Sequence, residues 1–385
     1  MSAFEREKKS ATPIVAICYD FDKTLSPTDM QAQGYIQSLK YDVNSFWQKC
    51  SALAVDNDMD ENLAWMYMMV LEAEGKLIPK RETLEEYGAG VELFPGVDTW
   101  FERINEFAKP KGIIIEHYIV SSGLKEMIEG TSIAKRGVFK KVYASSFYYN
   151  DKGVAVWPAQ TINFTGKTQY LFRISKGVLN VNDPDVNNHF EPEDIRIPFR
   201  NIIYIGDSDT DIPCMKLVKT YGGHSIGVYD WRNMDKSKVQ KMIHDDRISY
   251  YAAADYQDGG ELDQLVKTII DRTAQNELLE QLKIKCKQET TEAYDGKTIE
   301  QQKRNDLIVE LGASGSFFNT HNVIRRMKDF NWEEEERKRL YKIAIESNQV
   351  NWIIKDPDIM SFYKRLIAQE TKMSDVAKAV NNLIK

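Results

Sequence analysis

Several apolar runs in the chain each end abruptly at polar residues. The first covers residues 14–19 (IVAICY) and is followed directly by an aspartate. Similar runs lie within residues 113–123 (IIIEHYIVSSG), 201–211 (NIIYIGDSDTD) and 224–229 (HSIGVY). An apolar run without polar alternation is typical of a strand in a parallel sheet that is covered on both faces. The pattern therefore predicts buried, parallel strands.

Helical patterns lie between these runs, for example over residues 97–107 and 210–219. A strand, a helix and a further strand at this spacing form βαβ units. The sequence thus predicts an α/β fold with a doubly wound parallel sheet. Because parallel strands all end at one edge, the polar residues that follow them should meet there, where open sheets of this kind bind ligands.

Two segments depart from this strand and helix alternation. Residues 27–92 look helical, most clearly over 60–76, before Pro95-Gly96 signals a return to the core. From about residue 274 onward the chain is rich in Lys, Glu and Gln and shows no strand pattern. We therefore predict four segments: core 1–26, a helical cap insertion 27–92, the remaining core 93–273, and a helical C-terminal domain 280–385.

Composition narrows the class of protein further. The formal net charge of −7 argues against a general nucleic-acid binder, which would show a basic face. The charged N-terminus lacks an apolar signal region, and no apolar run reaches the ~18 residues that span a bilayer. The four cysteines form no CxxC pair, which suits a reducing compartment. We expect a cytoplasmic protein that binds no membrane.

Carboxylate and hydroxyl side chains, which together with lysine are the types used in phosphoryl transfer, follow the predicted strands. Lys167 opens a predicted helix in NFTGKTQYLF, and a hydroxyl and carboxylates end the apolar runs. Each is unremarkable alone, since a serine often caps a helix and a lysine is often solvated. All are predicted at one edge of the sheet, and together they form the candidate site: Asp20, Asp22, Ser121, Lys167, Asp207 and Asp211.

The set matches phosphoryl transfer through a covalent aspartyl-phosphate. Asp20 and Asp207, on different strands, can share Mg²⁺, which prefers carboxylate and phosphate oxygens. Asp20 would attack phosphorus, while Asp22 would protonate the leaving oxygen and later activate water. Ser121 and Lys167 would hold the non-bridging oxygens. Asp211 would ligate the metal or orient a metal-bound water.

The same residues resemble the signature motifs of the haloacid dehalogenase superfamily, in its phosphatase branch. DFDKT resembles the first motif, DxDx(T/V), and YIVSS the second. Lys167 resembles the third motif and GDSDTD the fourth, GDxxxD. The resemblance covers roughly residues 12–272, including AAADYQDGGELDQLV, which is similar to the family's last strand and helix.

This resemblance implies a Rossmann-like core and Mg²⁺ as cofactor. It implies that Asp20 is the nucleophile, that Asp22 is the acid and base, and that the Asp22 backbone carbonyl is a metal ligand. Metal ligation is thereby expected from Asp20, Asp22, Asp207 and Asp211. The cap resembles the helical caps of the phosphoserine phosphatase-like subgroup. We expect a Mg²⁺-dependent phosphatase that acts on a small phosphorylated metabolite.

Alternatives remain at this stage. The same intermediate would serve a phosphotransferase, in which an acceptor other than water enters. A phosphorylated signalling module also uses an aspartate, Mg²⁺, a hydroxyl and a lysine, but places its phosphorylated aspartate on a later strand. The chain could also be a phosphate-sensing module, in which the helical tail, which the catalytic scheme does not require, is the working surface for a protein partner or for self-association.

Overall fold

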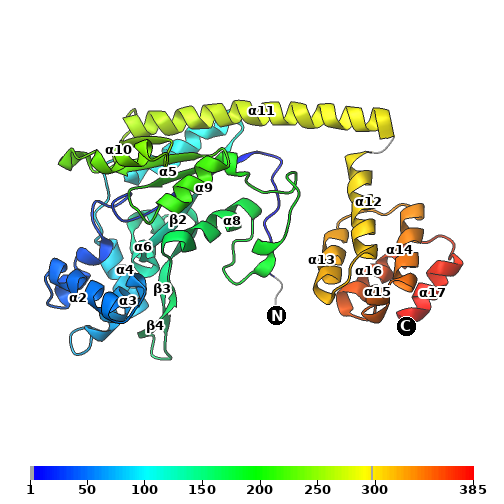
Figure 1. Ribbon diagram of the computed structural model, residues 1–385, viewed down its shortest axis with the longest axis horizontal. Helices are drawn as coiled ribbons and strands as arrows, with labels where there is room; N and C mark the ends of the chain where they lie inside the picture. Colours follow the sequence, from blue (N-terminus) through cyan, green and yellow to red (C-terminus); the bar gives the residue numbers. More distant parts are fainter. Residues whose placement is uncertain (1–3, 296–297) are drawn as a thin grey trace. The chain divides into compact units, whose positions relative to one another are not determined.

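The structure is a computed structural model that describes residues 4–295 and 298–385, with no side chains described for 291–295. The chain forms two compact units, Met1–Leu278 and Leu279–Lys385. The first contains a layered α/β arrangement and the second contains helices (Figure 1). Residues 1–3 of the expected core and 296–297 of the expected helical domain lie outside the described residues.

A seven-stranded sheet organises the first unit. Its strand order is β4-β3-β2-β1-β5-β6-β7, and each neighbouring pair is parallel except β3 with β4. The bounds are β1 Ile14–Tyr19, β2 Ile114–Leu124, β3 Phe139–Tyr149, β4 Ala155–Gln160, β5 Ile202–Gly206, β6 His224–Tyr229 and β7 Tyr250–Ala253. The α/β class and the apolar strands are confirmed, while β3 and β4 were not predicted.

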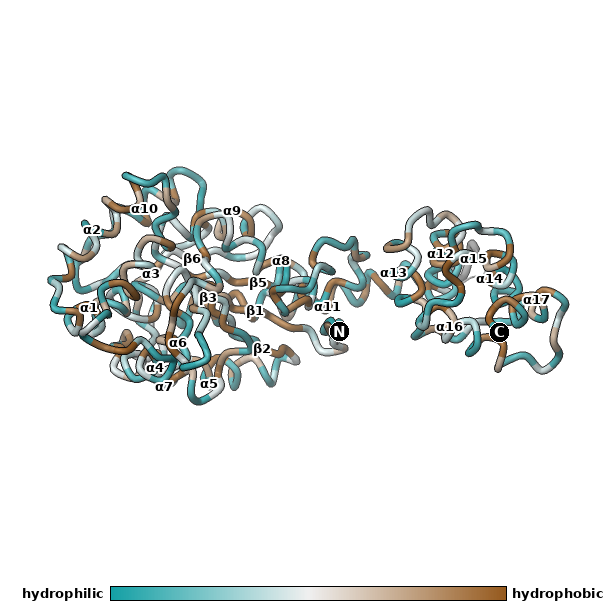
Figure 2. Tube along the Cα trace, turned by 90° about the horizontal axis from the view of Figure 1, so that it is seen from below, coloured by the Kyte–Doolittle hydropathy of each residue, from teal (hydrophilic) through white to brown (hydrophobic). Residues whose placement is uncertain are grey.

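Helices cover both faces of the sheet. The apolar residues concentrate in the central strands (Figure 2). One buried cluster joins the sheet to α5 (Val97–Ala108) and α11 (Glu261–Asp295). The other joins it to α8 (Thr168–Lys176), α9 (Ile212–Thr220) and α10 (Ser237–His244). This two-sided burial is the reason that the strands read as continuous apolar runs.

The segment after β1 forms a group of helices before the chain returns to the sheet. These are α1 Tyr35–Ser38, α2 Val43–Asp56, α3 Glu61–Leu71 and α4 Arg81–Ala89. Asp42 and Asp60 cap α2 and α3 by accepting backbone N–H bonds, as carboxylates at helix starts do. Helix α3 ends at Leu71, earlier than the predicted 76, and the chain turns there.

Helix α4 lies directly against α6 (Lys125–Gly130), the helix that follows β2. The close approach of α4 to α6 requires glycine at two positions. A Cβ on Gly88 would collide with the Met127 carbonyl oxygen, and one on Gly130 with the Glu85 carbonyl oxygen. The helical insertion is therefore fixed to the core by backbone contact, since no side chain fits between the two helices.

The β3-β4 hairpin reaches the same insertion from the core. The Ala155 N–H donates to the Pro79 carbonyl at 2.9 Å, and Lys80 forms an isolated bridge with Val154. Helix α3 packs on β4, beside it in Figure 1. Strand β4 is an edge strand, and it contains Pro158, which an edge tolerates because one side of the strand needs no partner.

The second unit is built from helices around its own buried cluster. They are α12 Ile299–Gly312, α13 Phe317–Met327, α14 Glu334–Glu346, α15 Asn348–Trp352, α16 Pro357–Ala368 and α17 Asp375–Leu383. Of five aromatic residues for which the sequence predicts a place in a small core here, Trp332 and Phe362 are buried, whereas Phe317, Phe318 and Trp352 are exposed. Among the described helices, none combines the length and the apolar character needed to cross a bilayer.

Candidate active site

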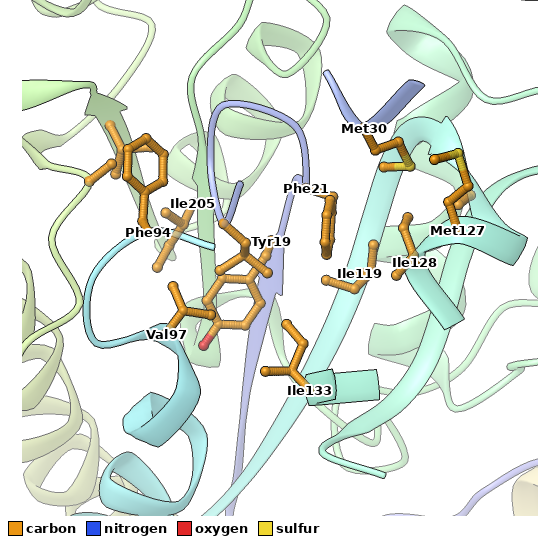
Figure 3. Close-up of a cluster of buried hydrophobic side chains, with 14 of the residues drawn as sticks. Tyr19, Phe21, Met30, Phe94, Val97, Ile119, Met127, Ile128, Ile133 and Ile205 are labelled. Atoms are coloured by element: carbon orange, nitrogen blue, oxygen red, sulfur yellow. The ribbon is translucent and has the colours of Figure 1, made fainter. Parts of the chain in front are cut away.

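Asp20 leaves the sheet where β1 ends. Its backbone N–H donates to the Ile205 carbonyl of β5 at 2.9 Å, so its position is fixed by the neighbouring strand. The next residue, Phe21, is fully buried and lies beside Ile119 in the cluster of Figure 3. Because Phe21 is held in the core, the chain around it is anchored and Asp20 is kept at the edge of the sheet.

Asp22 is held on the other side of Phe21. Its Oδ1 accepts the Met30 N–H at 2.8 Å. Lys23 follows in the left-handed region with φ 58°, a conformation that is uncommon for a residue with a side chain and that clusters at functional sites. The Lys23 ammonium lies 2.9 Å from an oxygen of Asp29. The loop after β1 is thus folded tightly around the second carboxylate.

Ser121 lies inside β2, which continues to Leu124, and not after it as the sequence predicted. Pairing with β3 becomes irregular between Val120 and Leu124. The Ser121 Oγ accepts the Gly123 N–H at 3.0 Å. A Cβ on Gly123 would lie 2.8 Å from Asp22 Oδ2 and 3.3 Å from Ser121 Oγ, so glycine is what lets these two side chains approach.

Lys167 joins two of the carboxylates. It lies at the end of a short 3-10 turn, Phe164–Lys167, directly before α8, and is fully buried. Its ammonium is 3.1 Å from Asp20 Oδ1 and 2.7 Å from Asp211 Oδ1. Burial acts to lower the pKa of Lys167, but these two carboxylates raise it above its ordinary value. The lysine is therefore charged at neutral pH.

Asp211 accepts hydrogen bonds on both oxygens. Besides Lys167, the Tyr204 hydroxyl donates to Oδ1 at 2.7 Å. The Ser208 N–H and hydroxyl donate to Oδ2 at 3.1 and 2.8 Å. A Cβ on Gly206 would lie 2.6 Å from Oδ2, so the carboxylate fits only beneath a glycine. Four donors occupy the acceptor sites of this carboxylate.

Tyr204 and Ser208 are site residues that the sequence reasoning missed. Tyr204 lies within the apolar run that forms β5. Its hydroxyl is the signal that could have found it, because a phenol buried in an aliphatic strand needs a partner. Ser208 lies inside GDSDTD, directly after Asp207, at a variable position of the pattern GDxxxD.

Three carboxylates come together at the edge of the sheet. One oxygen each from Asp20, Asp207 and Asp211 lies within 4.8 Å of the others. Asp22 is not in this group. Burial, with Asp211 and Asp20 nearby, raises the pKa of Asp207 to about 8, and burial with Asp211 raises that of Asp20 to about 6. These three carboxylates repel one another, and a bound cation would relieve that repulsion. Their oxygen atoms are suitable ligands for a hard ion such as Mg²⁺.

Asp22 has an environment suited to carrying a proton. Burial, together with the Asp29 and Asp20 carboxylates, raises the pKa of Asp22 well above its ordinary range. The Met30 N–H, which favours the charged form, opposes this shift only partly. A carboxyl whose pKa is raised in this way keeps its proton to a higher pH and is better able to donate it to a leaving oxygen.

A pH prediction follows from the raised pKa values. In metal-free protein prepared with EDTA, Asp20 and Asp207 bind protons more tightly when folded than when unfolded, where the pKa is about 3.9. Their contribution to the free energy of unfolding must therefore fall as pH rises from about 4 to about 8. Mg²⁺ should remove this loss by favouring the ionised carboxylates. Thermal unfolding at pH 5, 6.5 and 8, with EDTA or Mg²⁺, measures both effects.

Other buried groups titrate in the same range of pH, so the comparison needs a matched variant. Asp207→Asn removes one raised carboxyl and should make the fall in melting temperature between pH 5 and 8 shallower. The same slope in wild type and Asp207→Asn, or a melting temperature at pH 8 that Mg²⁺ does not raise, would contradict the proposed electrostatics.

A comparison with protein families decides what kind of protein carries this site. The model of the haloacid dehalogenase-like hydrolase family matches residues 17–216, just over half of the chain. The chain belongs to the haloacid dehalogenase-like hydrolase family. The matched range begins within β1, includes Asp20 and Asp22, and ends after Asp211, so it spans every candidate residue of the site.

Individual relatives of this haloacid dehalogenase-like hydrolase are distant. An uncharacterized protein of Borreliella burgdorferi is 26% identical over 276 residues, which are 65% of this chain and 94% of that protein. A HAD family hydrolase from Salmonella enterica serovar Typhi is 17% identical, with a TM-score of 0.45, over 68% of this chain and 73% of that one. A phosphoserine phosphatase in a phospho-aspartyl intermediate analogue form is 15% identical, with a TM-score of 0.40, over 66% of this chain and 99% of that one.

Proposed function

We propose that this chain is a Mg²⁺-dependent phosphomonoester hydrolase that acts on a small phosphorylated metabolite through an aspartyl-phosphate on Asp20. One observation carries the proposal. A buried carboxylate, Asp20, touches a buried lysine and lies within 4.8 Å of two further carboxylates, beside a second acid, Asp22, with a raised pKa. A nucleophile, a cation site and a proton donor are the parts that phosphoryl transfer requires.

The cation would be held by Asp20 and Asp207, with the Asp22 backbone carbonyl expected from the family resemblance. Mg²⁺ in this position would supply positive charge against the phosphate and the carboxylates. Asp211 has a different role in this proposal, because four donors already occupy its oxygens. It holds Lys167 in place, and Lys167 in turn pairs with a non-bridging oxygen of the substrate.

The first chemical step forms one bond and breaks another. A carboxylate oxygen of Asp20 attacks phosphorus, and the bond from phosphorus to the ester oxygen breaks. Asp22 gives its proton to that oxygen, so an alcohol leaves. Ser121 and Lys167 bind the non-bridging oxygens, where charge must be compensated. In the second step Asp22 takes a proton from water, water attacks phosphorus, and inorganic phosphate leaves Asp20.

The helical insertion of residues 27–92 supports a small substrate, since a cap over the site would exclude water and large molecules. A phosphotransferase would share the first step and differ in the acceptor of the second. The scheme uses no residue of the C-terminal unit. Its role as a surface for a protein partner or for self-association stays a prediction, as does the cytoplasmic location.

A substrate panel tests the proposal. Purified protein should hydrolyse p-nitrophenyl phosphate or members of a panel of phosphorylated metabolites, with phosphate release in Mg²⁺ and none in EDTA. Release of the alcohol without an equal amount of phosphate would favour the phosphotransferase. No turnover of any substrate, or full turnover in EDTA, would overturn the proposed function.

A further inference from the structure

An apolar cavity lies within the α/β unit and is lined by residues other than the carboxylates of the candidate site. Its volume is about 620 Å³. One wall is helix α3, another is the segment after it, and the third is strand β4, which packs beside α3 (Figure 1). None of the six candidate site residues contributes to its lining. The cavity is therefore separate from the proposed catalytic site.

The cavity has a buried floor and an exposed rim. Met66, Ala73 and Ala155 are buried and form the floor. The rim consists of large apolar side chains that are exposed to solvent, namely Tyr67, Leu71, Ile78, Val156 and Trp157. Trp157 is 66% exposed and Ile78 59%. Large side chains at this exposure, converging on one depression, form a contiguous apolar patch of the kind that marks a binding site.

The lining indicates the chemistry of the ligand. Glu74 is its one charged residue, and the rest of the wall is aliphatic, methionine, aromatic, proline or glycine. A volume of about 620 Å³ is that of a small-molecule site, for which the ordinary range is about 300–1,000 Å³. The buried floor favours a compact molecule that enters the cavity. A flat protein surface would cover only the opening and would not reach this floor. The Glu74 carboxylate disfavours an anionic group at the same site.

We propose that this cavity binds a small apolar molecule that carries no negative charge, such as an alkyl chain or a fused ring with an uncharged end. The ligand would contact α3 and β4 together, and so it would link the helical insertion to the core hairpin. The favourable free energy of binding would come from removing exposed apolar side chains from water. The inference does not depend on the proposed function, because its test measures binding and not turnover.

The probe is N-phenyl-1-naphthylamine, a neutral aromatic amine whose fluorescence rises in apolar surroundings. We expect saturable binding with one site per chain and a Kd on the order of 10 μM. Trp157, on the rim, should report the same event by a change in its own fluorescence. Decanol should displace the probe, and decanoate, with the same chain length but a carboxylate, should do so at least about tenfold less well because of Glu74.

Two variants on opposite walls test the location. Val156→Glu on β4 and Leu71→Glu on α3 change residues that are 42% and 44% exposed, so the fold should tolerate either. Each should weaken probe binding at least about tenfold. The matched control is Val181→Glu, the same substitution at a 38% exposed valine of the same unit that does not line the cavity. It should leave the Kd unchanged.

The proposal is overturned by absence of saturable binding, by uptake of many probe molecules per chain, or by equal effects of Val156→Glu and Val181→Glu. Decanol and decanoate competing equally would refute the assigned charge preference. Circular dichroism of each variant separates loss of binding from loss of fold. If either Val156→Glu or Leu71→Glu does not fold, the other variant still tests the location. A chain that binds the probe but hydrolyses no phosphate would refute the proposed function alone.

Discussion

Asp20→Asn will reduce kcat for phosphate release by about 10⁴-fold or more, because the amide cannot attack phosphorus. The fold should remain intact. Asparagine keeps an oxygen that accepts from Lys167, and it removes a charge whose burial beside Asp211 is unfavourable. Steady-state phosphate release at saturating Mg²⁺, with thermal unfolding of the same sample, measures both properties.

Asp209→Asn is the control for this loss. Asp209 lies in the same GDSDTD segment, is exposed, and has no part in the three-carboxylate group. The control should retain turnover within about twofold of wild type, as surface substitutions away from a site do. If Asp20→Asn kept a tenth or more of wild-type turnover, Asp20 could not be the nucleophile.

Lys167→Met is expected to damage both stability and activity. It leaves Asp20 and Asp211 buried without a cation, and breaking a buried ion pair in this way costs about 3–5 kcal/mol of the free energy of unfolding. The loss should be smaller at pH 5 than at pH 8, since Asp20, whose pKa is already about 6, accepts a proton more readily once the lysine is gone. Activity should fall by about 10²–10³-fold.

Tyr204→Phe separates charge from hydrogen bonding at the same oxygen. Tyr204 and Lys167 both donate to Asp211 Oδ1 at 2.7 Å, but only the lysine carries charge. The phenylalanine variant should lose about 1 kcal/mol and show no comparable dependence on pH. Equal losses in Lys167→Met and Tyr204→Phe, or a Lys167→Met loss that grows as pH falls, would show that the lysine is not neutralising the carboxylates.

The central strands were predictable because burial on both faces leaves a strong signal in the sequence. Strands β1 and β5 are entirely buried, and their residues are apolar. Strand β3 carries two lysines and β4 carries a proline, and only part of each is buried. Their pairing depends on contacts with the helical insertion, such as Ala155 with Pro79, that lie far away in sequence. Short-range patterns contain no such information.

The candidate site, like the sheet, could be predicted only in part from the sequence. Carboxylates at the ends of strands can be placed by topology, because parallel strands share an edge. The partners of those carboxylates cannot be placed in this way. The Tyr204 hydroxyl, the Met30 N–H and the close packing of side chains over Gly123 become relevant only when the distances between strand, loop and helix are known.

The contact between α4 and α6 limits how such an insertion can be exchanged. Helix α6 follows directly from the strand that holds Ser121, and it meets α4 with no side chain between Gly88 and Met127 or between Gly130 and Glu85. An engineer who grafts another cap onto this scaffold would have to transplant both helices and both glycines together. Any bulkier pair would push α6 away and shift the strand that holds Ser121, the proposed phosphate ligand, so a grafted cap must keep the backbone fit of these two helices.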